Sequence, residues 1–160
     1  PWATIGRTKD RQPNIITSLE LKPEVMEKHN IHLQEKYRKI RETEVRYETW
    51  MCDDADYVIV AFGSAARISQ KAIDMARAQG LRVGLFRPIT LWPFPTREIE
   101  TIAHGKKGIL VAEINAGQMV QDVRLAVNGN LPVEQFGRLG GIVPEPNEIV
   151  DALLKMKNEK

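Results

Sequence analysis

Apolar runs alternate with amphipathic stretches from about residue 45 to the C-terminus. The run 57–61 (Tyr-Val-Ile-Val-Ala) is almost wholly apolar and leads into Gly63 and Ser64. Strands that are apolar on both faces are typical of a parallel sheet covered by helices on both sides. The next segment, 65–79, carries apolar residues at helical spacing and meets Gly80, and glycine commonly ends helices. This pattern predicts a buried strand followed by a helix.

The same alternation continues along the chain. Segment 44–50 alternates polar and apolar residues, which predicts a half-buried edge strand. Strand-then-helix order predicts an α/β domain, whose functional loops lie at the carboxyl ends of the strands. Further strands are predicted at 81–86, 108–114 and 133–136, and further helices at 96–103, 118–127 and 147–157.

The first 44 residues follow a different pattern. Residues 1–21 hold glycine, proline and scattered polar residues without periodicity, which is typical of an arm lying on another domain. Pro23 and Glu24 favour a helix start, and apolar residues then recur at helical spacing among Glu, Lys and Arg. We predict an arm and linker helix over 1–44 and one folded domain over 45–160. Because the chain begins Pro1-Trp2 without methionine, we interpret it as a piece of a longer polypeptide or a processed product.

Composition narrows the possible functions. The net charge of the 160 residues is only +2, with 28% charged residues, so no charge cluster favours a nucleic-acid partner. The single cysteine, Cys52, excludes an internal disulfide and a four-cysteine iron–sulfur or zinc site within the chain. Such cysteine usage is typical of the cytoplasm. No stretch has the length and apolarity of a membrane span, so we expect a cytoplasmic location without a membrane partner.

Motifs for self-sufficient chemistry are incomplete. The turn Gly63-Ser64-Ala65 lacks the glycines of a dinucleotide fingerprint and the G-x-S-x-G of a nucleophile elbow, so we interpret Ser64 as a helix cap. His29 and His32 share a predicted helix without a third ligand. The acidic run 53–56 is interpreted as a turn rather than a cation site. We predict neither a catalytic residue nor a metal site in this chain.

Glu113 is the most informative ionisable residue, because it stands at the end of a predicted buried strand. A carboxylate there is partly desolvated and lies at the functional edge of the sheet. Two hypotheses stay open. Either Glu113 is a functional carboxylate, or it accepts hydrogen bonds from backbone groups of the neighbouring loop.

Four motifs in combination resemble a known family. They are 60–64 (Val-Ala-Phe-Gly-Ser), 84–95 (Gly-Leu-Phe-Arg-Pro-Ile-Thr-Leu-Trp-Pro-Phe-Pro), 113–119 (Glu-Ile-Asn-Ala-Gly-Gln-Met) and 122–124 (Asp-Val-Arg). The chain resembles the C-terminal part of the alpha subunit of 2-oxoacid:ferredoxin oxidoreductases, in the 2-oxoglutarate or 2-oxoisovalerate branch. The resemblance runs from the linker helix to the C-terminus.

This resemblance implies a fold like the C-terminal domain of transketolase. That fold is a three-layer α/β/α domain with a five-stranded mixed sheet, in the order 1-3-2-4-5 with strand 1 antiparallel. It also implies an enzyme of anaerobic metabolism that joins a 2-oxoacid to coenzyme A, releases carbon dioxide and passes electrons to ferredoxin. Thiamine diphosphate, Mg and iron–sulfur clusters would lie elsewhere in the complex, and this fragment would bind no cofactor. Its implied partners are the preceding pyrimidine-binding domain and a thiamine-binding beta subunit.

We therefore expect an assembly domain that is inactive in isolation. A proline-stiffened aromatic loop at 89–95 is pre-organised for docking, or else it covers the domain's own core. Arg87 is a candidate to meet an anionic group such as a coenzyme A phosphate. Two alternatives remain: the matching domain of a transketolase-like or 2-oxoacid dehydrogenase enzyme, and an independent flavodoxin-like domain that binds a small molecule. The residues expected to face a ligand or partner are Ser64, Arg87, Trp92, Phe94, Glu113, Asn115 and Gln118.

Overall fold

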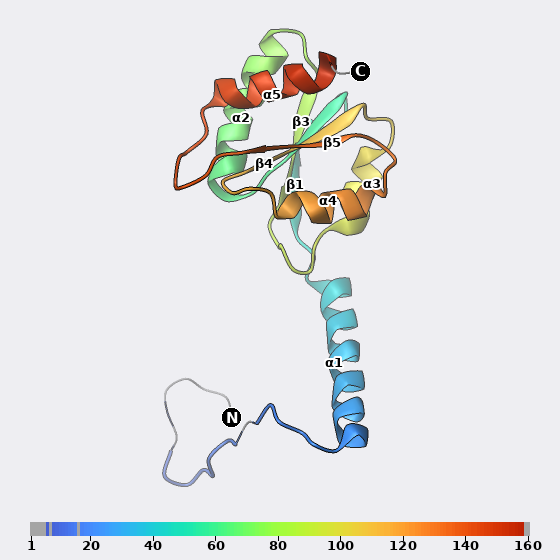
Figure 1. The fold of residues 1–160 in the computed structure, drawn as a ribbon, viewed down its shortest axis with the longest axis vertical. Helices are drawn as coiled ribbons and strands as arrows, with labels where there is room; N and C mark the ends of the chain where they lie inside the picture. Colours follow the sequence, from blue (N-terminus) through green and yellow to red (C-terminus); the bar gives the residue numbers. More distant parts are fainter. Residues whose placement is uncertain (1–5, 7, 16, 159–160) are drawn as a thin grey trace. The chain divides into compact units, whose positions relative to one another are not determined.

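A computed structural model describes residues 6, 8–15 and 17–158 of the chain. The chain divides into two compact units, residues 1–39 and 40–160. Helix α1 (Pro23–Thr43) supplies residues 23–39 of the first unit, and its last four residues belong to the second unit (Figure 1). Residues 1–5, 7 and 16 of the predicted arm lie outside the described residues.

Helix α1 begins where the sequence predicted. The Lys22 carbonyl accepts hydrogen bonds from the N–H groups of Val25 and Met26, both at 3.1 Å, and so closes the first turn. Glu24 stands in the first turn and Arg41 in the last, an arrangement that the helix dipole favours. No residue of α1 is buried. Of the apolar residues that recur at helical spacing in this segment, Met26, Leu33, Tyr37 and Ile40 are half-buried.

The second unit is built on a single five-stranded sheet in the order β1-β3-β2-β4-β5 (Figure 1). β1 pairs antiparallel with β3, and the other pairs are parallel. The order and the antiparallel edge that the resemblance implied are therefore confirmed. The strands are β1 (Tyr47–Trp50), β2 (Tyr57–Val60), β3 (Val83–Pro88), β4 (Gly108–Glu113) and β5 (Val133–Gly137).

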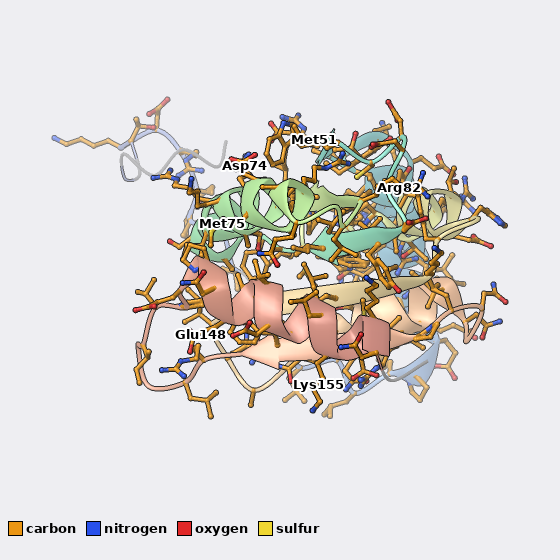
Figure 2. The ribbon with its side chains drawn as sticks, turned by 90° about the horizontal axis from the view of Figure 1, so that it is seen from above. Met51, Asp74, Met75, Arg82, Glu148 and Lys155 are labelled. Atoms are coloured by element: carbon orange, nitrogen blue, oxygen red, sulfur yellow. The ribbon has the colours of Figure 1, made fainter. Side chains whose placement is uncertain are left out.

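Helices cover both faces of the sheet, as near-continuous apolar strands require. Helices α2 (Gly63–Ala78) and α5 (Pro146–Asn158) pack on one face, over Ile59 and Leu110, which are both fully buried. Figures 1 and 2 show α2 and α5 side by side, with Met75 marking α2 and Glu148 marking α5. Helices α3 (Thr96–Ala103) and α4 (Met119–Val127) pack on the opposite face. The result is the predicted three-layer α/β/α arrangement.

The edge strand β1 is shorter than predicted. Its sequence pattern starts at Glu44, but the Glu44 N–H still donates to the Ile40 carbonyl at 2.9 Å, so the end of α1 takes up the first of these residues. β1 then starts at Tyr47, whose ring stacks on Phe86 of β3 with the ring centres 5.1 Å apart. The helical hydrogen bond therefore takes Glu44 out of the strand, while the Arg46 carbonyl accepts hydrogen bonds from the N–H groups of Ile89 and Thr90.

Ion pairs join the amino ends of three parallel strands. Asp56, Arg82 and Lys107 each directly precede a strand, β2, β3 and β4 respectively. Asp56 carboxylate oxygens lie 2.7 Å from Arg82 Nη2 and 3.4 Å from Lys107 Nζ. Nearby, Asp54 accepts two hydrogen bonds from the Arg77 guanidinium, at 2.9 and 2.7 Å. The acidic run 53–56 is therefore a turn whose residues Asp54 and Asp56 form ion pairs, which agrees with its interpretation as a turn.

The Asp56 pairing predicts a specific loss of stability in acid. The hydrogen bond from Arg82 holds the pKa of Asp56 below its ordinary value of 3.8. The folded state therefore binds this proton less readily than the unfolded state, so the stabilisation is present above that value and is lost as the pH falls through the lower pKa of the folded state. In Asp56→Asn, we expect a lower urea midpoint at pH 7 and a shallower decline below pH ~4. The urea midpoint is measured by circular dichroism at several pH values. An equally steep decline of the midpoint below pH ~4 in the variant and the parent would contradict this prediction.

Candidate functional site

The strand order places a topological switch point at the carboxyl ends of β2 and β4. The chain leaves β2, returns through α2 to β3 on one side, and then crosses through α3 to β4 on the other side. Loops that diverge in this way leave a crevice between neighbouring strands, where ligands bind in open α/β sheets. Gly63, the first residue of α2 and three residues after the end of β2, has a φ of +57°, in the left-handed region that favours glycine. The loops after β2 and β4 therefore border the candidate site.

Glu113 ends β4 inside this crevice and is 1% exposed. Its carboxylate accepts hydrogen bonds from the backbone N–H groups at the start of α4: Met119 at 2.9 Å, Val120 at 3.1 Å and Gln118 at 3.2 Å. The Asn115 amide donates a further bond to Oε2 at 3.1 Å. A negative charge at a helix N-terminus is stabilised by the free N–H groups and the helix dipole. Of the two hypotheses for Glu113, this geometry fits the acceptor of backbone hydrogen bonds.

The loop that follows β4 is held by further contacts. Asn115 Oδ1 accepts the Gly117 N–H at 2.7 Å, and Gln135 Nε2 of β5 lies 3.5 Å from the Asn115 carbonyl oxygen. Gly137 lies so close to this carbonyl that any Cβ at position 137 would clash with it. Hydrogen bonds therefore hold the backbone of the loop 114–118 at Asn115, Gly117 and Gln118, and the side chain of Gln118 is exposed.

A pocket of about 170 Å³ opens at the switch point, and we call it the switch-point pocket. Its walls come from the loops after β2 and β3, the end of β4 and the first turn of α4. The volume lies below the ~300 Å³ at which pockets for drug-sized ligands begin. The residues that line it are Phe62, Leu91, Glu113, Gln118, Met119 and Asp122.

A second depression, of about 280 Å³, lies away from the switch point. It is formed between the edge strand β1 and helix α3, and its lining includes Tyr47, Phe86 and Arg97. The sequence candidates do not line it. Although it is larger, its position at an outer edge of the sheet makes it the weaker candidate for a functional site.

The structure brings only part of the predicted site set together. Glu113 and Gln118 line the switch-point pocket, and Asn115 bonds to Glu113. Arg87 lies on the opposite face of the sheet, because it shares its face with Leu85 and the α2/α5 core, whereas Glu113 points towards α4. Arg87 Nη1 donates to Glu48 Oε2 of β1 at 2.8 Å.

The other predicted residues are distributed between surface and core. Ser64 is exposed but does not cap α2, because the Phe62 carbonyl accepts the Ala66 N–H at 3.2 Å and the helix starts at Gly63. Trp92 is 54% exposed, whereas Phe94 is half-buried against the α3/α4 core. In the loop 89–95, Phe94 therefore packs inward, as the hypothesis of a loop that covers the core expects, while the docking role of the loop stays a prediction.

Sequence reasoning missed three residues of the pocket, Phe62, Leu91 and Asp122. Phe62 and Leu91 belong to motifs that the sequence analysis quoted without assigning either residue to a site, and only the strand order brings their loops together. Asp122 carried a usable signal, because it lies three residues after Met119 in a predicted first helical turn next to the 113–119 motif.

Two features are absent from the described part of the chain, residues 6, 8–15 and 17–158. No group of three or more His, Cys, Asp and Glu side chains is arranged to hold a metal ion there. None of the helices there combines the length and apolarity that crossing a bilayer requires.

Comparison with known proteins identifies relatives across the whole chain. The family described as pyruvate:ferredoxin oxidoreductase core domain II matches residues 55–149. Ketoisovalerate oxidoreductase subunit VorB of Methanothermobacter marburgensis is 40% identical over 158 residues, which cover 99% of this chain and 44% of the relative. The 2-oxoglutarate synthase subunit KorA of the same organism is 35% identical over 135 residues, which cover 84% of this chain and 36% of the relative. The chain thus spans less than half the length of these curated relatives.

Solved structures support the fold independently. A chain of 2-oxoglutarate:ferredoxin oxidoreductase from Magnetococcus marinus, solved with 2-oxoglutarate, coenzyme A and succinyl-CoA bound, superposes with a TM-score of 0.73 at 22% identity. That match covers 86% of this chain and 24% of the other. An inactive β4 tetramer of a split-gene transketolase matches with a TM-score of 0.60 at 18% identity, over 71% of this chain and 41% of the other. At these identities the likeness concerns the fold, and it confirms the transketolase-like architecture. The family match and the two curated relatives together establish that this chain belongs to the 2-oxoacid:ferredoxin oxidoreductase family, within which it corresponds to core domain II.

Proposed function

We propose that this chain is the C-terminal domain of the alpha subunit of a 2-oxoacid:ferredoxin oxidoreductase and serves in its assembly. The whole enzyme would decarboxylate a 2-oxoacid oxidatively, form the coenzyme A thioester and pass electrons to ferredoxin. The observation that carries this proposal is the 40% identity to VorB over 99% of the chain. Residues 1–44 would be the arm and linker helix, and residues 45–160 the transketolase C-terminal-like domain.

A role in assembly rather than in chemistry is supported by the state of Glu113. Both oxygens of this buried carboxylate accept hydrogen bonds, from N–H groups of α4 and from the Asn115 amide. A general base must reach the proton that it removes within hydrogen-bond distance. Glu113 is instead engaged in holding the loop and the helix together, so catalysis would depend on other parts of the complex.

The switch-point pocket does not fit the cofactor that the family implies. Thiamine diphosphate carries a diphosphate, while the charged residues lining the pocket are the two acids Glu113 and Asp122. A volume of about 170 Å³ is also small for a molecule of that size. In our proposal, thiamine diphosphate, Mg and the iron–sulfur clusters belong to the pyrimidine-binding domain, the beta subunit and other partner chains.

The carboxyl edge of the sheet is the proposed contact surface for those partners. Trp92, Leu91 and Ile89 are 54%, 47% and 47% exposed and belong to one loop. Neighbouring exposed apolar side chains of this kind are typical of protein interaction sites. We propose that this loop, with Ser64, Asn115 and Gln118, faces the partner, while Phe94 fixes the loop on the core. The complex would be cytoplasmic.

The substrate class follows the relatives. VorB is named for ketoisovalerate and is 40% identical, whereas KorA is named for 2-oxoglutarate and is 35% identical over less of the chain. We therefore propose a branched-chain 2-oxoacid as substrate, with 2-oxoglutarate as the second candidate.

The test is reconstitution of the whole enzyme. The full subunit, co-expressed with its partner subunits, should reduce ferredoxin only when a 2-oxoacid and coenzyme A are both present. Turnover of 2-oxoisovalerate should exceed turnover of 2-oxoglutarate. An assembled complex with no ferredoxin reduction for any 2-oxoacid would overturn the proposal.

One substitution tests the contact surface in that complex. Trp92→Ala should weaken subunit association about tenfold or more, because exposed tryptophans are frequent hot spots of protein interfaces. Leu125→Ala is the matched control, since Leu125 is 77% exposed on α4, outside the loop 89–95. Association is measured by sedimentation over a concentration series. Equal association of the two variants would contradict the assignment of this surface.

Coenzyme A contact through Arg87 stays a separate proposal. Because Arg87 is paired with Glu48, it would have to exchange that carboxylate for a phosphate of the ligand. In the reconstituted enzyme, an unchanged apparent affinity for coenzyme A in Arg87→Ala would dismiss it.

A further inference from the structure

The switch-point pocket has an unusual combination of walls. Phe62, Leu91 and Met119 form an apolar surface, and Glu113 and Asp122 contribute two carboxylates. Of the six lining residues, none is basic. The pocket therefore offers apolar contact together with negative charge, which suits a cationic group on an apolar stem.

The two carboxylates differ in the hydrogen-bonding capacity that remains for a ligand. The charge of Glu113 is already met by three backbone N–H groups and one amide. Asp122 is exposed, and no hydrogen bond or ion pair in the described part of the chain involves its side chain. Asp122 thus supplies an available acceptor at the pocket, while Glu113 keeps the pocket negative and its wall rigid.

The dimensions point to one side chain rather than a whole ligand. About 170 Å³ is less than pockets for drug-sized molecules usually provide. A guanidinium is planar, stacks on aromatic rings such as Phe62, and pairs with a carboxylate through two parallel hydrogen bonds. A lysine ammonium is more strongly hydrated and gains less from an aromatic wall.

We propose that the switch-point pocket receives an arginine side chain from a partner protein. This inference rests on the proposed assembly function for the source of the arginine, and it specifies how the carboxyl edge is recognised. The guanidinium stacks against Phe62 and pairs with Asp122, and its methylene stem lies along Leu91 and Met119. Leu91 also belongs to the exposed apolar loop that carries Trp92, so the pocket is continuous with the proposed contact surface. Arginine and tryptophan are residues that commonly dominate binding energy at interfaces.

Small molecules that mimic the end of the side chain test this directly on the 160-residue chain. The probe is n-butylguanidinium, compared with n-butylurea, its neutral analogue of the same shape, and with n-butylammonium. Chemical shifts of the Met119 and Leu91 methyl groups and of the Gln118 amide report occupancy. We expect saturable shifts at these three positions with butylguanidinium, and binding about fivefold weaker or more for each of the other two probes.

Matched variants give the decisive comparison. Asp122→Asn should weaken butylguanidinium binding about fivefold and leave binding of butylurea unchanged. Asp151→Asn, which removes an exposed acid from α5, should change neither. Phe62→Leu keeps the wall apolar and should also weaken binding of butylguanidinium more than binding of butylurea. Equal binding of butylguanidinium and butylurea, equal binding of butylammonium, or insensitivity to Asp122→Asn would each overturn the proposal. These outcomes are independent of ferredoxin reduction, so this inference can fail while the proposed function stands.

Discussion

Replacement of Glu113 by alanine is expected to lower the free energy of unfolding by about 4 kcal/mol. The substitution removes the acceptor for three backbone N–H groups at the start of α4, two of which belong to the buried residues Met119 and Val120. A hydrogen bond to a charged acceptor contributes about 1.5–3 kcal/mol, and a buried donor left without a partner costs about 1–3 kcal/mol. Water that enters through the adjacent pocket will offset part of the loss.

Urea unfolding followed by circular dichroism measures this effect. Glu134→Ala, at an exposed position of β5, is the control and should stay within about 0.5 kcal/mol of the parent. Glu113→Gln retains one acceptor oxygen and should lose about half as much. Hydrogen exchange adds a local readout, because protection of the amides of residues 118–120 should fall first. A loss below ~1 kcal/mol for Glu113→Ala would show that the helix start does not depend on this carboxylate.

Replacement of Gly84 by alanine is expected to cost about 3 kcal/mol. A Cβ at this position of β3 would lie 2.5 Å from the Met51 carbonyl oxygen and 2.8 Å from both Cα and Sγ of Cys52. The Met51 and Cys52 backbone has little freedom to move away. Arg77 Nη2 donates to the Met51 carbonyl at 2.7 Å, and Lys106 Nζ donates to the Cys52 carbonyl at 2.7 Å.

Gly108→Ala provides a matched control on the neighbouring strand β4. Its Cβ would meet the flexible side chain of Met156 and the Pro132 carbonyl at 3.4 Å, which is ordinary contact. We expect a change within about 1 kcal/mol for this variant. The urea midpoint should fall in Gly84→Ala with an unchanged slope, because the surface exposed on unfolding stays the same. Equal midpoints for the two variants would mean that the β1–β2 connection yields easily.

The strand and helix positions were largely predictable because their signal is local. Apolar runs identified β2, β3 and β4, and helical spacing identified α2 to α5 to within two residues at most boundaries. α3 was predicted at 96–103, where it lies. One boundary was wrong by three residues at β1, where the end of α1 engages Glu44, the first residue of the predicted strand.

The site was predictable only in part, and the reason is long-range. The motif 113–119 pointed to Glu113, Asn115 and Gln118, which do lie together because a single loop carries them. Arg87 followed the same argument, since it too stands at the carboxyl end of a strand. It faces the other side of the sheet because residues alternate between the faces of a strand. In β3 Arg87 shares its face with Leu85, on the α2/α5 side, whereas in β4 Glu113 shares its face with Val111, on the α3/α4 side.

The sequence by itself determined the class of fold, the succession of strands and helices, and the family to which the chain belongs, because these depend on periodicity and on contiguous motifs. Only the tertiary structure decided that Glu113 holds the start of α4, and that loops after β2, β3 and β4 meet around one pocket. Those outcomes depend on which strands become neighbours and on which side each residue points. Both follow from packing between segments far apart in the chain, which no local pattern encodes.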